Sequence, residues 1–422
     1  MKNMMSFNKI SFVKVLFGLC LPAMSLSALA NTVTYGYADL EALMMKNSPS
    51  LRAAASEVDA ARFAVTTARA FPNPQIESLK GTRASRPGVS SPDRPIKSLS
   101  VTQDLDMPWH RFSRVDGAQA GFAAAEANQR AFVNDMRAKL RVRYFDLLRR
   151  QSESHASRED RTLMEGIRSR IALRVEVGEA PRFELIKADA EMLNSQKLAQ
   201  SAEARVHQSR VALRALVGPE LPETFEVIDL DKSLPSLPPL NQVKAEILAT
   251  NPEIARTRAE RLQLEKKLSE EKALRLPKVA LRAESEQDPE FNNRRVGVAV
   301  EVPLWNWRVG PVGEAASRLA QTSDELIYQE FSLLQALDSA YQQFNIAQAQ
   351  VSALESGIVR QTANALRISE VAYRAGEKGF LEVLDAQRAY RAARNELITA
   401  RFELSSAWAE IERIRATPMV TP

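Results

Sequence analysis

The sequence predicts a mainly α protein with a small β part, built from two copies of one structural unit. Ala, Arg, Glu and Leu dominate the 422 residues, whereas only 6% are aromatic and 26% are charged. This composition favours long helices over a compact mixed globule. Two stretches, about 112–177 and 312–375, contain no proline, and each ends at a glycine. Landmark residues also recur in the same order in both halves of the chain, which indicates an internal duplication.

The N-terminus has the pattern of a secretory signal peptide over residues 1–30. Three lysines precede an apolar run from Val15 to Met24, and Ala28-Leu29-Ala30 offers a cleavage site of small residues. A membrane anchor is the alternative, but the apolar run is too short and no stop-transfer pattern follows it. Cleavage removes three lysines and no acids, which lowers the net charge from +5 to +2. A nucleic-acid partner is therefore not predicted.

The single cysteine, Cys20, lies inside the predicted signal peptide. A lipoprotein signal would need a small residue before it, and Leu19 is not small. The mature chain would then contain no disulfide and no thiolate metal site, and no cofactor is predicted.

The duplication is visible in paired landmarks. Lys46–Val65 resembles Ala249–Leu268, and Pro49 and Pro74 have counterparts 203 residues later. Tyr144 and Gly178 have counterparts at offsets of 197 and 198, so the first half has the longer loop between these landmarks. The predicted organisation is a first repeat over 31–218, a linker over 219–240, a second repeat over 241–415 and a tail over 416–422.

Each repeat begins with a helical segment and a β-hairpin. The helical segments are expected at about 38–70 and 242–276, and both end near proline. The first hairpin strands are expected near 76–83 and 278–286. The returning strands alternate apolar with polar or small residues, as a half-exposed strand does; their apolar residues are Leu99, Val101 and Leu105 in the first repeat, and Val296, Val298, Val300 and Val302 in the second. Proline and tryptophan close both hairpins.

A very long helix, a glycine turn and a return helix complete each repeat. About 65 helical residues span on the order of 100 Å. The return helices are expected to end near 217 and 413. Each carries small or apolar residues at alternating spacings of three and four, which predicts coiled-coil packing. These positions are Leu185, Ala188, Met192, Ser195 and Ala199 in the first repeat, and Val383, Ala386, Tyr390, Ala393 and Leu397 in the second.

The strand count predicts a trimer. No stretch after residue 30 has the run of apolar residues that a membrane helix needs. A protein that meets a bilayer with strands must close them into a barrel, and four strands are too few. Three copies would supply twelve strands. Their paired long helices would then form a trimeric α-barrel tunnel joined to a composite 12-stranded β-barrel.

The residues resemble the TolC family of outer-membrane efflux channels. The resemblance rests on the duplicated plan, on VPLWNW (Val302–Trp307) and above all on GEKGFLEVLDAQRAYRAARNEL (Gly376–Leu397). It implies a homotrimer in the outer membrane of a Gram-negative bacterium, with its helical part in the periplasm. It also implies a periplasmic adaptor and an inner-membrane pump, expected to be of the RND type, as partners. The stretch PLWNWRVGPVGEA favours the branch that serves heavy-metal pumps.

The same resemblance implies where the periplasmic entrance lies. The matching acidic residues are Glu382 and Asp385, which three copies would place around one axis as a ring of six carboxylates. Links between the two turns would hold such an entrance closed, with Tyr373 and Lys378 as donors and Glu184 as acceptor. Lysine replaces the usual arginine at position 378, so a bidentate link is not available there.

The turns themselves are the expected contact with the adaptor. Their residues are Gly178 and Gly376, flanked by Arg174 and Arg374. All the entrance residues could instead be solvated residues at helix starts, where acids interact favourably with the helix dipole.

Other functions fit the sequence less well. No catalytic motif is present, and His110, His155 and His207 are isolated from one another, so neither an enzyme nor a metal site is predicted. A periplasmic adaptor would carry one helical hairpin rather than two, and a coiled-coil rod would carry neither strands nor a signal peptide. A channel for type I protein secretion remains an alternative, because such systems use the same kind of channel.

Overall fold

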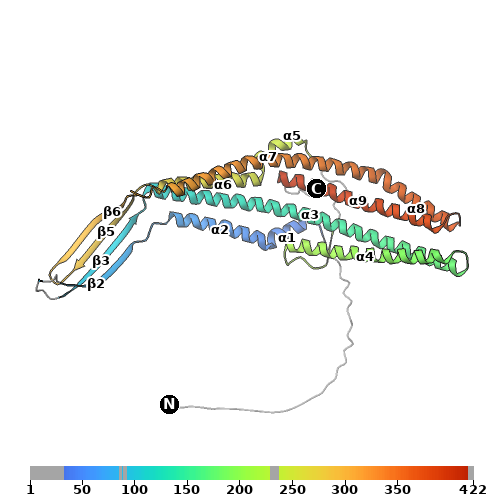
Figure 1. Cartoon of the computed structure of the whole chain (residues 1–422), viewed down its shortest axis with the longest axis horizontal. Coiled ribbons are helices and arrows are strands. Elements are labelled where there is room, and N and C mark those ends of the chain that lie inside the picture. Colours follow the sequence, from blue (N-terminus) through green and yellow to red (C-terminus); the bar gives the residue numbers. More distant parts are fainter. Residues whose placement is uncertain (1–32, 85–87, 89–92, 229–236, 417–422) are drawn as a thin grey trace, which may run out of the picture.

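The computed structural model describes residues 33–84, 88, 93–228 and 237–416. The predicted signal peptide, with Cys20, lies outside these residues. Figure 1 shows an elongated molecule with the β-hairpins at one end and the turns of the long helical hairpins at the other. The mainly α class with a small β part is confirmed.

The two repeats contain the same elements in the same order. The first repeat consists of α1 (Tyr37–Asn47), α2 (Pro49–Arg69), β2 (Gln75–Arg83), β3 (Arg94–Leu105), α3 (Pro108–Glu176) and α4 (Arg182–Val217). The second consists of α5 (Leu240–Thr250), α6 (Pro252–Ala273), β5 (Lys278–Gln287), β6 (Asn292–Glu301), α7 (Val309–Ala353), a π-helical turn η1 (Leu354–Ile358), α8 (Val359–Arg374) and α9 (Phe380–Arg415). The strands and long helices lie close to their expected positions.

The first helical segment of each repeat is two helices rather than one. The break falls immediately before Pro49 and Pro252, where Ser48 and Asn251 have extended ψ angles of 120° and 125°. Proline disfavours the helical conformation of the residue before it, which explains both breaks. Asn251 then caps α6, because its Oδ1 accepts hydrogen bonds from the backbone of Glu253 and Ile254.

The long helices of the two repeats differ. The 69 residues of α3 are uninterrupted, whereas the equivalent helix of the second repeat contains the π-turn η1. A π-turn inserts one extra residue into the helical ladder. No proline marks this interruption, although Ser356 and Gly357 lie within it.

A two-stranded parallel sheet was not predicted. β1 (Val33–Tyr35) pairs with β4 (Phe225–Val227), which lies in the stretch expected to be a surface linker. Leu221 and Phe225 are fully buried there, and the Phe225 ring packs edge-on against Tyr35 at 5.9 Å. This part of the linker therefore belongs to the core beside α1, α3 and α4, while residues 229–236 lie outside the described part of the chain.

The return helices pack as their spacing predicts. In α4, Ala188, Ser195 and Ala199 are buried, and in α9 Val383 and Ala393 are buried. The remaining positions of both seams are half-buried. The small residues at these positions allow the backbones of neighbouring helices to approach closely.

The four-stranded antiparallel sheet has the order β2-β3-β5-β6, so the two hairpins join through β3 and β5. Its register separates two faces. The apolar face carries Ile76, Leu99, Val101, Leu105, Val279, Leu281, Ala283, Val296, Val298 and Val300. The charged face carries Glu77, Asp104, Lys278, Arg282, Glu284, Glu286, Arg295 and Glu301. Val296 is 85% exposed and Ile76 is 71% exposed, so the single chain leaves the apolar face uncovered.

An ion-pair cluster fixes the junction between the sheet and the long helix. The Asp106 carboxylate accepts hydrogen bonds from Arg111 at 2.9 Å and Arg114 at 2.7 Å. At the equivalent junction of the second repeat, the Glu271 carboxylate accepts a hydrogen bond from Arg308. Burial acts to raise the pKa of Asp106, but the hydrogen bonds from Arg114 and Arg111 outweigh it and hold that pKa below its usual range.

The Asp106→Asn substitution is expected to destabilise the junction by about 2 kcal/mol, because the substitution leaves two arginines without their charged acceptor. A lowered pKa means that the stabilisation is present above the ordinary aspartate pKa of about 3.9 and is lost as the pH falls through the folded-state value. Thermal unfolding of both proteins should therefore differ at pH 7 and converge in acid. Asp104→Asn, on an exposed carboxylate of the same strand, is the control; equal effects of the two substitutions would contradict the assignment.

Candidate functional site: the turns of the long helical hairpins

The two hairpin turns have closely similar backbones. Gly178 and Gly376 have φ angles of +80° and +77°, a region that favours glycine. In the first turn the Glu179 amide donates to the Arg174 carbonyl at 2.8 Å, and in the second Glu377 donates to Ala372 at 3.0 Å. These bonds satisfy the carbonyls at the helix ends, which explains why both repeats reverse direction at a glycine.

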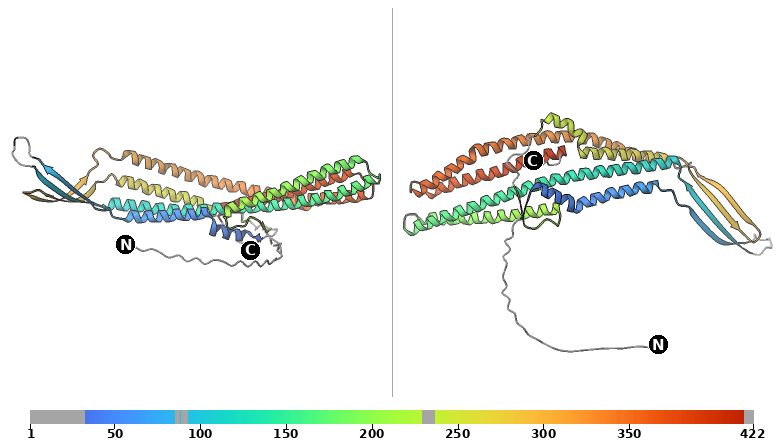
Figure 2. Two further views of the ribbon diagram at one scale, coloured as in Figure 1. Left: turned by 90° about the horizontal axis from the view of Figure 1, so that it is seen from below. Right: turned by 180° about the vertical axis from the view of Figure 1, so that it is seen from behind.

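An apolar cluster lies directly behind the turns. It joins α3 and α4 of the first repeat to α8 and α9 of the second, and its fully buried members include Ile171, Ala188 and Phe380. Tyr373 is 6% exposed, and its hydroxyl has no hydrogen-bond partner among the described residues. The Arg174 guanidinium lies 5.1 Å from the centre of the Tyr373 ring. The cluster thus holds the turns of the two repeats side by side (Figure 2).

The two predicted acidic residues lie at the start of α9. Glu382 and Asp385 are both exposed and are separated by three positions, so their carboxylates share one side of the helix. The Lys378 ammonium lies 2.7 Å from the Glu382 carboxylate. The exposed fractions of these two side chains are 44% and 54%, so the pair is a surface ion pair.

The predicted link between the turns is not formed within the single chain. Glu184 lies half-buried in the first turn of α4, and the structure pairs Lys378 with Glu382 rather than with Glu184. The flanking arginines each pair with an acid of their own repeat: Arg174 with Glu179 of the first turn at 3.9 Å, and Arg374 with Glu370 of α8 at 3.3 Å.

Two arginines of α9 join the repeats instead, and sequence analysis missed both. Arg388 forms an ion pair with Glu191 of α4. Arg394 donates to Asp160 of α3 at 2.7 Å and to Glu159 at 3.1 Å. Only 13% of the Arg394 side chain and 9% of the Asp160 side chain are exposed. In a sequence with arginines throughout its helices, no local signal distinguishes these two from solvated ones.

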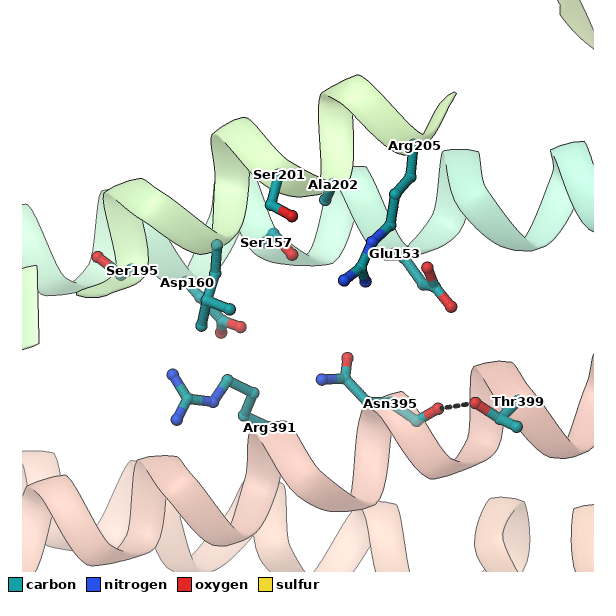
Figure 3. A pocket seen from close by; sticks show the side chains of 11 residues that line it. Glu153, Ser157, Asp160, Ser195, Ser201, Ala202, Arg205, Arg391, Asn395 and Thr399 are labelled. Atoms are coloured by element: carbon teal, nitrogen blue, oxygen red, sulfur yellow. Dashed lines mark hydrogen bonds between the residues drawn. The ribbon is translucent and has the colours of Figure 1, made fainter. Parts of the chain in front are cut away.

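A polar cleft of about 250 Å³ opens beside the Asp160–Arg394 pair. Figure 3 shows Glu153 and Asp160 from α3, Arg205 from α4, and Arg391 and Asn395 from α9 around it. Burial raises the pKa of Asp160 above its usual range, although the Arg394 and Arg391 guanidiniums oppose this.

Both carboxylates of the cleft are already engaged, so they are not free to bind a cation. Asp160 pairs with Arg394, and Glu153 accepts a hydrogen bond from Arg150 at 2.9 Å.

The histidines do not gather at a site. His155 lies 3.1 Å from Glu159, His207 is exposed on α4, and the buried Nε2 of His110 has no partner within the described residues. In the part of the chain that the structure describes, no three His, Cys, Asp or Glu side chains are grouped to hold a metal ion. None of the helices described combines the length and the apolar character needed to cross a membrane.

Comparisons with known proteins give one consistent result. The family model of outer membrane efflux proteins matches residues 42–219 and 244–416. The chain is 25% identical over 372 residues to the cobalt-zinc-cadmium resistance protein CzcC of Cupriavidus metallidurans, and the match covers 86% of each chain. It is 22% identical over 281 residues to the nickel-cobalt-cadmium resistance protein NccC of Alcaligenes xylosoxydans xylosoxydans, covering 66% of this chain and 63% of that protein.

Among solved structures, the Campylobacter jejuni CmeC outer membrane channel superposes with a TM-score of 0.78. It is 14% identical in sequence, and the match covers 90% of this chain and 85% of CmeC. At this identity the likeness shows a shared fold.

The Arg394→Gln substitution is expected to lower the apparent unfolding temperature, because it leaves the buried Asp160 carboxylate without its main partner. Loss of one member of a buried pair costs about 3 kcal/mol. Protonation of Asp160 removes the uncompensated charge, so the deficit measured by thermal unfolding should be smaller at pH 5 than at pH 8.

Arg401→Gln is the matched control for this prediction. Arg401 also reaches from α9 to an acid, Glu355, but 53% and 43% of the two side chains are exposed, so the expected effect is within about 1 kcal/mol. An Arg394 variant as stable as the Arg401 variant would show that the buried pair does not fasten the repeats together.

Proposed function

Since the chain belongs to the outer membrane efflux protein family, we propose that three copies form one channel whose helical tunnel is gated at the hairpin turns. The chain is an outer-membrane efflux channel and not an enzyme. As the outer-membrane component of a tripartite efflux system, it acts with a periplasmic adaptor and an inner-membrane pump. The number of copies, the gate and the cargo are the new parts of the proposal.

The open sheet supports a trimer. β2 and β6 are edge strands, and each therefore leaves one row of backbone donors and acceptors unpaired. In lipid such groups must be satisfied by neighbouring strands. Joining β6 of one protomer to β2 of the next closes three sheets into a barrel of twelve strands, with the apolar face in contact with outer-membrane lipid.

The helical layer supports the same assembly. Figure 1 shows α7 and α8 along one edge of the layer, and α2 and α4 along the other. Both edges expose large apolar side chains; on α7 and α8 these are Ile327, Tyr328, Phe331, Ile346 and Ile368, and on α2 and α4 they are Phe63, Phe183, Ile186, Leu193 and Val211. Contact between these two edges in neighbouring copies would bury both.

Aromatic side chains support the placement of the sheet in a bilayer. Trp305 is 92% exposed and Trp307 is 57% exposed, and both follow β6 at the junction with the helices. Trp109 lies at the matching junction of the first repeat. Tryptophan is enriched at the interface between lipid and water, where the ring is in an apolar layer and its N–H can reach water.

The proposed gate is the ring that Glu382 and Asp385 form around the threefold axis. At a separation of about 10 Å, two carboxylates repel each other by a few tenths of a kcal/mol in water and by several times that in a poorly hydrated constriction. Such a ring attracts cations and favours opening unless other contacts hold it closed. Lys378, which lies beside Glu382, reduces this repulsion in the closed state.

The proposed closing contact combines Tyr373, Lys378 and Glu184. Because Lys378 pairs with Glu382 within its own chain, a link to Glu184 would form between neighbouring protomers or on rearrangement of the turn. The exposed turns at Gly178 and Gly376, with Arg174 and Arg374 beside them, are the proposed contact with the adaptor.

The proposed cargo is divalent metal cations, delivered by a pump of the RND type. The names of the relatives CzcC and NccC support this, since both describe resistance to cobalt and cadmium. An acidic entrance is compatible with cationic cargo. The pump would determine most of the selectivity, because the tunnel selects only by width and charge.

The ring is tested by combining Glu382→Gln with Asp385→Asn in reconstituted channels. Wild-type protein should run as a heat-modifiable trimer and should be blocked by polyvalent cations added to the periplasmic side; the double variant should lose this block, because the charges that attract the cations are gone. Glu377→Gln, which removes an exposed carboxylate of the same turn, should leave the block intact. Unchanged block in the double variant would rule out this ring.

Lys378→Ala is expected to raise the basal single-channel conductance or open probability. The substitution removes both the charge beside Glu382 and the proposed donor to Glu184, and both losses favour opening. Lys378→Arg keeps the charge and adds a bidentate donor, so its conductance should be equal to or below that of the wild type. A Lys378→Ala channel that conducts like the wild type would contradict the proposed closing contact.

A further inference from the structure

The charges of the four-stranded sheet are distributed unequally between its two faces. Within the described strands, all five carboxylates lie on the charged face: Glu77, Asp104, Glu284, Glu286 and Glu301. The apolar face carries no acid but three bases, which are Lys80, Lys97 and Arg294. A face in contact with hydrocarbon excludes charges of both signs, so the three bases need a separate explanation.

The three bases are confined to the end of the sheet farthest from the helices. Lys80 is the register partner of Lys97, and Lys97 is in turn opposite Gln287. The row below, toward the helices, carries Arg294 opposite Ser285. The remaining rows, closer to the helices, contain mainly valine, leucine and isoleucine. The side chains of the apolar face therefore change from aliphatic to basic within two rows.

The distance from the tryptophans to the row that contains Lys80 and Lys97, called the basic row below, matches the height of the apolar band of a membrane barrel. Asn292 is the register partner of Gln287, which is in turn the partner of Lys97, so these residues lie in one row across the sheet. Ten positions along the chain separate Asn292 from Val302, which lies close to the tryptophans. At about 3.4 Å per residue and a tilt of about 40°, these positions span about 26 Å across a bilayer. The apolar band of an outer-membrane barrel is about 25 Å tall. The basic row is therefore at the level of the outer headgroups.

The pairing of the lysines is unfavourable unless an anion lies between them. Like charges directly opposite each other on neighbouring strands repel. Lys80, Lys97 and Arg294 have no ion pair within the described part of the chain, and all three are exposed. The acids of the β5–β6 hairpin are engaged by other arginines, since Asp288 pairs with Arg83 at 2.6 Å and Glu290 pairs with Arg94.

We propose that Lys80, Lys97 and Arg294 form a binding site for the phosphate groups of the glycolipid in the outer leaflet. The inference rests on the proposed trimer in one respect. Lys80 lies on β2 and Arg294 on β6, the opposite edge strands, so closure of the barrel brings Arg294 of one copy beside the two lysines of the next. Each trimer would then hold three such sites, one at each junction between protomers.

The experiment is native mass spectrometry of the full-length, delipidated protein titrated with bis-phosphorylated lipid A. The variant combines Lys80→Gln, Lys97→Gln and Arg294→Gln, which keeps polar side chains at the same positions. Wild-type protein is expected to bind at least tenfold more tightly than this variant. Lipid A without its phosphates should bind both proteins equally weakly, and excess inorganic phosphate should not displace the intact lipid from the wild type.

The matched control combines Lys278→Gln, Arg282→Gln and Arg295→Gln, which removes three bases from the charged face of the same sheet, and it should bind like the wild type. Equal affinity of the first variant and the wild type would overturn the proposal. Binding of the dephosphorylated lipid to the wild type as tightly as bis-phosphorylated lipid A, or displacement of the intact lipid by inorganic phosphate, would also overturn it. The same spectra report the oligomeric state, so failure of the wild type to form trimers would count against the proposed assembly separately from any loss of lipid binding.

Discussion

The structure depends on one requirement that the single chain does not meet. The edges and the apolar face of the four-stranded sheet have to be covered. Its apolar face is exposed over all four strands, and the unpaired edges of β2 and β6 leave backbone groups that lipid cannot satisfy. Within the part of the chain that the structure describes, no other element covers that face, because the helices leave the sheet at one end and extend away from it (Figure 1). In the proposed trimer, the single chain is one part of a closed barrel, and the long helices continue the pore of that barrel.

The duplication follows from this geometry. One repeat supplies one hairpin, and the two hairpins join through the antiparallel pair β3 and β5. On the helical side, α9 of the second repeat packs against α3 of the first, and the buried Arg394–Asp160 pair lies at that contact. The repeats are thus joined at both ends of the molecule. Asp106 with its arginines and Glu271 with Arg308 fix the angle at which each sheet half meets its helices.

Much of this architecture could be predicted from sequence because it rests on local chemistry. Glycines 178 and 376 end the long helices through a backbone conformation that favours glycine, and the alternation of Val296, Val298 and Val300 requires a strand with two different faces. What could not be predicted depends on contacts between distant segments. The strand β4 is three residues long and becomes a strand only because β1 lies beside it. The cross-repeat partners of Arg388 and Arg394 are some 197 and 234 residues away along the chain, and no pattern identifies them.

The ion pairs also indicate where a closed tunnel would be held together. The Lys378–Glu382 pair at the turn is about half exposed, and such surface pairs contribute roughly 0–1 kcal/mol. Arg394 and Asp160 are nearly buried, and separating them would leave an uncompensated charge in a poorly hydrated environment. A movement of α9 away from α3 therefore costs more at Asp160 than at the turn. In the proposed gate, the turn residues set the charge that a cation meets and supply the closing contact, and the buried Arg394–Asp160 pair adds a further resistance to opening several helical turns above them.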